Sequence, residues 1–254
     1  MNIAFDAAWV AAVLFCALRL GAVLALTPVL TGIALPPRMT VLLILSLSAI
    51  LVMGGVVQPA PLPHDLLALL LSGLAELATG ALLAFAIFVA FAAFSLAGKL
   101  LDIQIGFSVG SIFDPITRTR SPVLASTLDL FAIAAFFALN AHHMLLRGLA
   151  YSLERVPLGR MVELASPELL ARQFGLVFIH GLLLAAPVAF CLLLVDVGLA
   201  VLSRNIPQLN VFILSIPIKI VIGLSMLALM AQMAGPLLRR MFDAIFQFWS
   251  QVLG

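Results

Sequence analysis

Long apolar stretches, separated by short breaks of proline, glycine and charge, fill most of this chain. A helix needs about 20 apolar residues to cross the hydrocarbon core of a bilayer. Six stretches come near this length or exceed it: Ala7–Leu30, Met39–Val57, Leu66–Gly98, Pro122–Leu146, Leu169–Ser203 and Val211–Leu238. The pattern predicts an all-α membrane protein of about six apolar helical segments, several broken by proline, in a single domain over residues 1–254.

The breaks carry their own structural signals. Ser166-Pro167-Glu168 is typical of an N-cap, a first-turn proline and a first-turn acid, so a helix should begin there. Pro122 likewise suits the first turn of a helix, whereas Pro217 should break or kink the last apolar segment. Residues 99–121 are polar and glycine-bearing, and we expect a loop there.

The tail from Arg239 to Gly254 has a different pattern. Apolar residues recur at spacings of three and four, which predicts a helix with one apolar stripe: Met241, Phe242, Ile245, Phe246, Trp249 and Val252. The sequence leaves open whether this stripe packs on partner proteins or lies at the lipid surface.

Composition supports the membrane assignment and excludes other classes. Hydrophobic residues make up 64% of the 254 residues and charged residues 9%, whereas soluble domains are about half apolar and a quarter charged. The net charge is +2 and no long basic run occurs, which argues against nucleic-acid binding. Cys16 and Cys191 lie in apolar runs, where we expect them to be buried hydrophobic residues.

Away from the ends of the apolar segments, five charged residues lie inside them: Arg19, Glu76, Asp129, Asp196 and Lys219. A charge at membrane depth is costly unless it is paired or placed in a wet cavity, so each is a candidate functional residue. Structural ion pairs within a helix bundle are the preferred interpretation. A proton relay is the alternative, but these scattered charges define no path.

No pattern for catalysis or cofactor binding is present. The chain lacks the GxSxG, HExxH and P-loop motifs. His142 and His143 are adjacent, so on a helix they should point about 100° apart and share no metal. We therefore expect a protein that is not an enzyme and holds neither metal nor cofactor.

The segment from Gly106 to Pro122 combines glycines with apolar side chains. Gly106 and Gly110 allow tight bends, and Asp114-Pro115 favours a turn. The segment either packs on its own helices or enters a pore and blocks it. Its candidate residues are Gly106, Phe107, Ser108, Gly110, Ile112, Phe113, Asp114, Pro115 and Pro122.

A second informative stretch joins the last two apolar segments. Pro207 should end the preceding helix, and Gln208 and Asn210 can bond the backbone groups that it frees. Broken helices at membrane depth persist only when they are buried in protein or line a cavity. The residues of interest are Arg204, Pro207, Gln208, Asn210, Phe212, Pro217, Lys219 and Gly223.

At these two stretches the sequence resembles the FliR/SctT family of type III export gate subunits. The most specific match is Arg204-x-x-Pro207-Gln208-x-Asn210-x-Phe212, followed by Pro217-x-Lys219-x-x-x-Gly223. The second is Gly106-x-x-x-Gly110 with Asp114-Pro115 and Pro122. Arg19 and Glu76-x-x-x-Gly80 also fit the family.

The resemblance implies a subunit that joins FliP-like and FliQ-like subunits around a secretion pore in the bacterial inner membrane, at the flagellar basal body. FlhB-like and FlhA-like export proteins would be further partners, membrane lipid would surround the helices, and unfolded flagellar proteins would pass through. The loop at about 99–121 would plug the resting channel. The Pro-Gln-Leu-Asn-Val-Phe sequence favours a flagellar gate subunit. An injectisome gate subunit is the alternative, and a secondary transporter is a less favoured one because no inverted repeat is visible.

Overall fold

The computed structural model describes residues 7–28, 32, 36–55, 57, 65–107, 122–160, 162, 165–206 and 211–254. In these ranges the regular structure is helical and no strand occurs, which confirms the all-α prediction. The chain divides into two compact units. Unit 1 comprises Met1–Val89, Phe136–Gln173 and Phe242–Gly254, and unit 2 comprises Ala90–Ala135 and Phe174–Met241.

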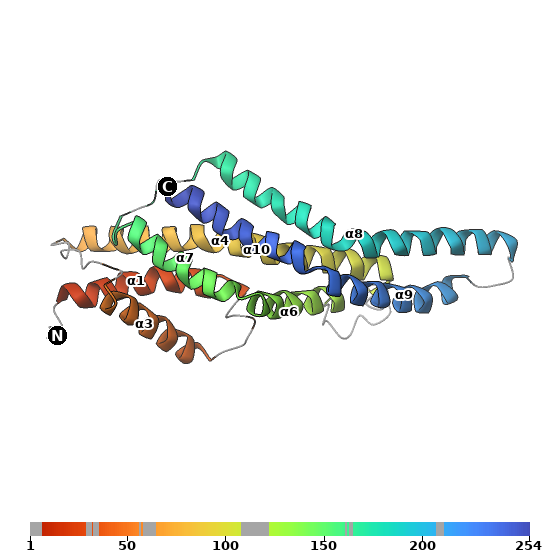
Figure 1. Cartoon of the computed structure of the whole chain (residues 1–254), viewed down its shortest axis with the longest axis horizontal. Helices are drawn as coiled ribbons and strands as arrows, with labels where there is room; N and C mark the ends of the chain where they lie inside the picture. The colour runs from red at the N-terminus through yellow and green to blue at the C-terminus, as the bar shows by residue number, and fades with distance from the viewer. Residues whose placement is uncertain are drawn as a thin grey trace. The chain divides into compact units, whose positions relative to one another are not determined.

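The helices follow the apolar stretches of the sequence (Figure 1). Their bounds are α1 (Ala7–Ala25), α3 (Pro37–Met53), α4 (Leu66–Ile105), α6 (Val123–Ala138), α7 (Ala141–Arg155), α8 (Pro167–Asn205), α9 (Val211–Met233) and α10 (Gly235–Leu253). The expected start near Ser166 is present, since the Leu169 N–H donates to Ser166 Oγ at 3.3 Å.

Among the described helices, four are long and apolar enough to cross a membrane, or five if one bent pair counts as a single span. We expected six apolar segments, and two of them do not form a single helix long enough to cross a membrane. The stretch after Met39 forms a helix of only 17 residues. The stretch from Pro122 is broken at Asn140, whose φ of 59° is left-handed, and α6 and α7 meet there with a bend of 72°.

One expected boundary was wrong. We expected residues 99–121 to be loop, but α4 continues to Ile105, so Lys99 to Ile105 are helical. Pro217, which we expected to break or kink the last apolar segment, does not break it, because α9 runs through it. A proline removes one backbone hydrogen bond from a helix interior, and apolar surroundings keep the remaining ones strong enough to hold the helix together. Pro187 likewise lies within α8, which changes direction near its middle (Figure 1).

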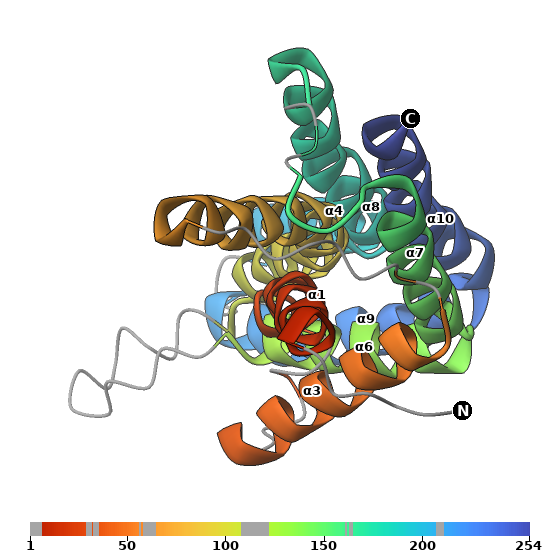
Figure 2. The same ribbon diagram turned by 90° about the vertical axis from the view of Figure 1, so that its left-hand side faces the viewer.

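Unit 1 contains α1, α3 and α7, together with most of α10, and α7 and α10 lie side by side (Figure 2). The apolar stripe of α10 is buried on its own chain. Phe242 packs edge-on against Phe136 with ring centroids 5.3 Å apart. Trp249 is 2% exposed and donates Nε1–H to Leu83 O at 2.9 Å. The tail helix is thus part of the fold of this unit.

Unit 2 is built around the last third of α4, which three helices approach through glycine. A Cβ at Gly98 would lie 2.3 Å from Ala125 Cα of α6, and one at Gly181 of α8 would lie 2.9 Å from Leu96 Cδ2. A Cβ at Gly223 of α9 would lie 2.5 Å from Ile105 Cδ1. Small residues let membrane helices approach closely, so they set the packing of this unit.

Candidate functional site

Arg19 of α1 and Glu76 of α4 form an ion pair inside unit 1, with both side chains 0% exposed. Arg19 Nε donates to Glu76 Oε2 at 2.6 Å, and Nη2 donates to Oε1 at 3.1 Å. The planar guanidinium matches a carboxylate in this forked arrangement, which is stronger than a single contact between charges. Two charges that the sequence places at membrane depth therefore neutralise each other.

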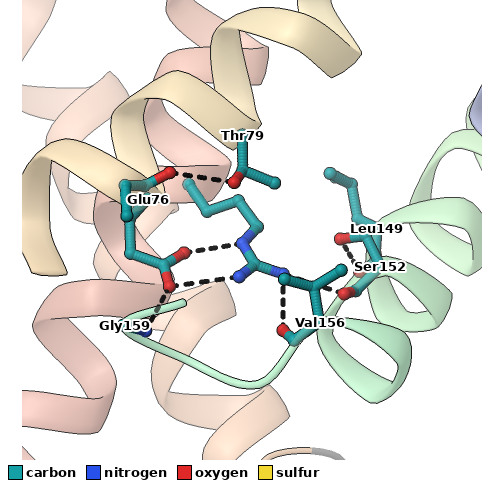
Figure 3. A network of polar contacts seen from close by, with 8 residues as sticks. Glu76, Thr79, Leu149, Ser152, Val156 and Gly159 are labelled. Carbon is teal, nitrogen blue, oxygen red and sulfur yellow. Dashed lines mark hydrogen bonds and ion pairs between the residues drawn. The ribbon is translucent and has the colours of Figure 1, made fainter. Parts of the chain in front are cut away.

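The same network holds the end of α7 (Figure 3). Arg19 Nη1 donates to Ser152 O at 2.8 Å and to Val156 O at 3.1 Å. The Gly159 N–H donates to Glu76 Oε1 at 2.7 Å. Ser152 O also accepts from Val156 N at 3.0 Å, and the carbonyls at the end of a helix carry partial negative charge, so a buried arginine stabilises them. The pair thus joins α1, α4, the end of α7 and the turn that follows.

Two glycines make this geometry available. Gly80 lies one turn after Glu76, and a Cβ there would lie 2.6 Å from both Arg19 O and Ala22 Cβ. Only a residue without a side chain lets α1 approach α4 this closely. Gly159 has φ +80°, a conformation that other residues adopt at a cost, and it directs its N–H toward the carboxylate. The Glu76-x-x-x-Gly80 spacing therefore has a packing reason.

The chemistry of the pair suits a structural role. Arginine keeps its proton at all physiological pH values, so it does not pass protons along a chain. Both carboxylate oxygens of Glu76 already accept hydrogen bonds from Arg19 or from Gly159. Removing one partner of such a buried pair leaves an uncompensated charge, which costs about 3–5 kcal/mol.

Unit 2 contains the remaining intramembrane charges. Ser95 Oγ of α4 donates to Asp129 Oδ1 of α6 at 2.6 Å. Lys219 Nζ of α9 lies 2.5 Å from Asp196 Oδ1 of α8, and these side chains are 18% and 41% exposed. The Asp196–Lys219 pair is therefore open to the surroundings of the chain, unlike the Arg19–Glu76 pair.

Asp102 is a functional candidate that sequence reasoning missed. It is 3% exposed, and its carboxylate accepts hydrogen bonds from Leu124 N and Ala125 N, each at 3.0 Å. The residue was overlooked because Lys99 was taken as the end of a helix. The apolar residues between them, Leu100 and Leu101, are the signal that could have extended that helix.

The histidine pair differs from the expectation drawn from an ideal helix. His142 and His143 lie in the first turn of α7, and their ring centroids are 4.1 Å apart at an interplanar angle of 46°. The side chains fold toward each other although their backbone positions are about 100° apart. Within the described ranges, no group of three His, Cys, Asp or Glu side chains could hold a metal ion.

Most of the expected plug residues lie outside the described part of the chain: Ser108, Gly110, Ile112, Phe113, Asp114 and Pro115. Gly106 is described and has φ +97° at the end of α4, where a glycine is needed. Phe107 follows it. Pro122 immediately precedes α6, and its carbonyl accepts from Ser126 N at 3.0 Å.

The second motif is also only partly described. Pro207, Gln208 and Asn210 lie outside the described residues, as does the side chain of Phe212. Arg204 is in the last turn of α8, where a cation is favourable. Lys219 and Gly223 lie on α9, one paired with Asp196 and the other against Ile105.

Comparison with known proteins agrees with the resemblance seen in the sequence. Residues 10–245 match the profile of the family described as bacterial export proteins, family 1. The chain is 31% identical to the flagellar biosynthetic protein FliR of Bacillus subtilis over 166 residues, which is 64% of each chain. It is 30% identical to that of Escherichia coli strain K12 over 179 residues, 70% of this chain and 69% of the relative.

A relative from another secretion system also matches. The chain is 31% identical over 147 residues to the Yop proteins translocation protein T of Yersinia pestis, covering 57% of this chain and 56% of that protein. The family profile covers most of the chain, and the FliR relatives agree with it over about two thirds of their length. The chain therefore belongs to family 1 of the bacterial export proteins, the family that includes FliR.

Proposed function

We propose that this protein is a non-enzymatic structural subunit of a flagellar type III protein export gate in the bacterial inner membrane. The observation that carries the proposal is the family match over residues 10–245, together with relatives named as flagellar FliR proteins. The helices long enough to cross a membrane support it, because a gate subunit must be held in the bilayer.

The described surface suits a subunit that works among partners. Within the apolar stretch of α9 only 6% of the residues are buried inside the chain, and within that of α8 only 28%. Lipid and neighbouring subunits would cover this surface. FliP-like and FliQ-like gate subunits are the proposed neighbours, with FlhB-like and FlhA-like export proteins beside them and unfolded flagellar proteins passing through.

We further propose that the segment from Gly106 to Pro122 seals the resting pore. A pore that admits a polypeptide leaks ions unless apolar groups exclude water from it. Phe107, Ile112 and Phe113 would supply that seal, and Gly106 and Gly110 would let the segment move. Deleting Ser108 to Arg120 should raise the ion leak while the gate still assembles. An unchanged leak through an assembled gate would refute the seal.

Gene deletion tests the export role directly. Deleting the gene in its host should remove hook and filament proteins from the culture medium, and re-expressing this chain should restore them. A chain with Gly198→Ala serves as a matched control, because a Cβ at this glycine of α8 meets nothing within 4 Å. Normal secretion of flagellar proteins after deletion would refute the flagellar assignment.

The Yop translocation relative supports one alternative, a gate subunit of an injectisome. Deletion would then abolish secretion of effector proteins and leave flagella intact. The same two assays on one deletion strain separate the alternatives, since each system has its own secreted proteins.

A further inference from the structure

An apolar groove opens on one side of unit 1. Its volume is about 610 Å³, and it is lined by α1, α3 and the first turns of α4. α1 lies between the other two helices and forms the floor of the groove (Figure 2). The lining side chains are those of alanine, valine, leucine, isoleucine and phenylalanine, with two glycines among them. A volume of this size is typical of a site for a small molecule.

The walls of this groove are open to the surroundings of the chain. Leu14 of α1 is 53% exposed, Val41 of α3 is 55% exposed and Leu74 of α4 is 60% exposed. Both α1 and α4 are long and apolar enough to cross a membrane, so these surroundings are hydrocarbon. The groove offers water no side chain for a hydrogen bond, and an empty groove would forfeit dispersion contacts. An apolar occupant therefore suits it.

One end of the groove carries a positive charge. Arg38, Val41 and Leu45 follow one another at spacings of three and four on α3, so they share one face of that helix. Val41 and Leu45 line the groove, whereas Arg38 is exposed in the first turn of α3. Long side chains of a helix point toward its N-terminus, which directs the guanidinium past the end of the apolar lining. Within the described ranges Arg38 forms no ion pair.

This combination of charge and apolar lining selects among possible occupants. A helix of 17 residues is about 25 Å long, slightly less than the hydrocarbon core of about 30 Å, so its ends reach the headgroups when it lies across the bilayer. Arginine binds phosphate through two parallel hydrogen bonds. An apolar helix of a partner would fill the groove but leave Arg38 without a counter-ion, whereas an anionic phospholipid supplies both an acyl chain and a phosphate.

We propose that this groove binds one anionic phospholipid, with an acyl chain lying along α1 between α3 and α4 and the phosphate bound by Arg38. The bound lipid completes the apolar surface of unit 1 and neutralises the charge at the start of α3. The inference depends on the membrane location of the chain and not on which export system the chain serves.

The test uses the full chain, purified in mild detergent with the rest of the export apparatus and stripped of lipid. The complex is titrated with palmitoyl-oleoyl phosphatidylglycerol or with the corresponding phosphatidylcholine, and native mass spectrometry counts the lipids that stay on the chain after its release from the complex. The wild type should prefer phosphatidylglycerol. Arg38→Gln should lower this preference about fivefold, the effect of one arginine at an anionic lipid surface. Arg240→Gln, at an exposed arginine of α10, is the matched control and should leave the preference unchanged.

A second variant tests the groove itself. A Cβ at Gly73 would lie 3.5 Å from Leu18 Cδ1, an ordinary contact, and leucine favours a helix over glycine, so Gly73→Leu should fold while its side chain fills the groove. It should abolish retention of the lipid, whereas Gly198→Ala should retain it.

Three results would overturn the proposal: no preference of the wild type for phosphatidylglycerol, an equal loss of preference in both arginine variants, or unchanged lipid retention by Gly73→Leu. Unchanged retention together with fewer co-purified partner subunits would assign the groove to a helix of a neighbouring subunit. The comparison of the two arginine variants decides the matter alone where Gly73→Leu cannot be purified.

Discussion

At the scale of single residues, the Arg19–Glu76 pair makes the sharpest prediction. Both side chains are 0% exposed and share two hydrogen bonds. Glu76→Gln removes the negative charge and leaves Arg19 buried without compensation. We expect a loss of about 3–5 kcal/mol in the free energy of unfolding. Thermal unfolding of the purified chain in detergent measures it, and a change below about 1 kcal/mol would contradict the buried pair.

Two further variants separate charge from structure. Arg239→Ala removes an exposed arginine of α10 and should change stability by no more than about 0.5 kcal/mol. The double variant Arg19→Met with Glu76→Leu removes both charges, so it should recover most of the stability that either single change loses. If the double variant assembles but does not support export, the pair has a role beyond holding the helices together.

The sequence located these charges but not their partners. Arg19 and Glu76 stood out because charge is costly in an apolar segment, yet their pairing spans 57 residues and depends on tertiary packing. The hydrogen bonds of Arg19 to Ser152 O and Val156 O could not be predicted from the sequence. Every residue has a backbone carbonyl, so residue types do not show which carbonyls accept from a distant side chain. Asp102 was missed because the sequence does not show whether a polar residue near the end of an apolar segment belongs to the helix or to the loop that follows.

At the scale of helices, the close packing at Gly98 predicts that one added methyl group strongly lowers the stability of the chain. A Cβ there would lie 2.3 Å from Ala125 Cα and 2.7 Å from Ala125 N. Backbone atoms cannot move aside as a flexible side chain can, so Gly98→Ala should force α4 and α6 apart. We expect a loss of about 1–3 kcal/mol in stability, measured by thermal unfolding in detergent.

Gly198→Ala in α8 provides the comparison. A Cβ at this position meets nothing within 4 Å. Alanine favours the helix over glycine by about 1 kcal/mol, so this change should be neutral or stabilising. Equal destabilisation by both substitutions would mean that glycine matters for helix flexibility and not for the contact between α4 and α6.

Hydropathy predicted that the apolar segments form helices, but it did not predict several of the helix boundaries. The polar residues Asn140, His142 and His143 interrupt the apolar run from Pro122, but so short a polar stretch does not by itself show that the backbone adopts φ 59° there. Lys99 suggested the end of a helix, although a long side chain near a helix end can reach a polar layer while the backbone stays helical. The tail stripe of α10 was predicted, whereas its packing in unit 1 required tertiary contacts.

At the scale of the whole molecule, the exposed apolar helices indicate a chain that needs its surroundings. Exposed large side chains on α9 include Ile213 at 68%, Val221 at 64% and Met233 at 81%. In water such a surface would aggregate, and in a bilayer it is covered by lipid or by partner subunits. Stability measured on the isolated chain therefore gives a lower limit for stability in the assembly.

The Asp196–Lys219 pair tests what covers this surface. Neutralising one member leaves the other charge partly exposed on an apolar helix, at a cost of about 2.5–3.5 kcal/mol near the centre of a bilayer. Asp196→Leu alone should therefore reduce the amount of membrane-integrated chain, whereas Asp196→Leu with Lys219→Leu should restore it. Quantitative blotting of washed membranes measures both, with the Gly198→Ala chain as the control.

Protein secretion by the double variant then distinguishes a structural pair from a docking contact. If lipid covers the pair, the double variant should insert, assemble and export as the wild type does, because leucine suits hydrocarbon better than an ion pair. If a neighbouring subunit binds these charges, the double variant should insert normally but co-purify with fewer partner subunits. Restored insertion with lost assembly would therefore place a subunit interface on α8 and α9, and restored export would place lipid there.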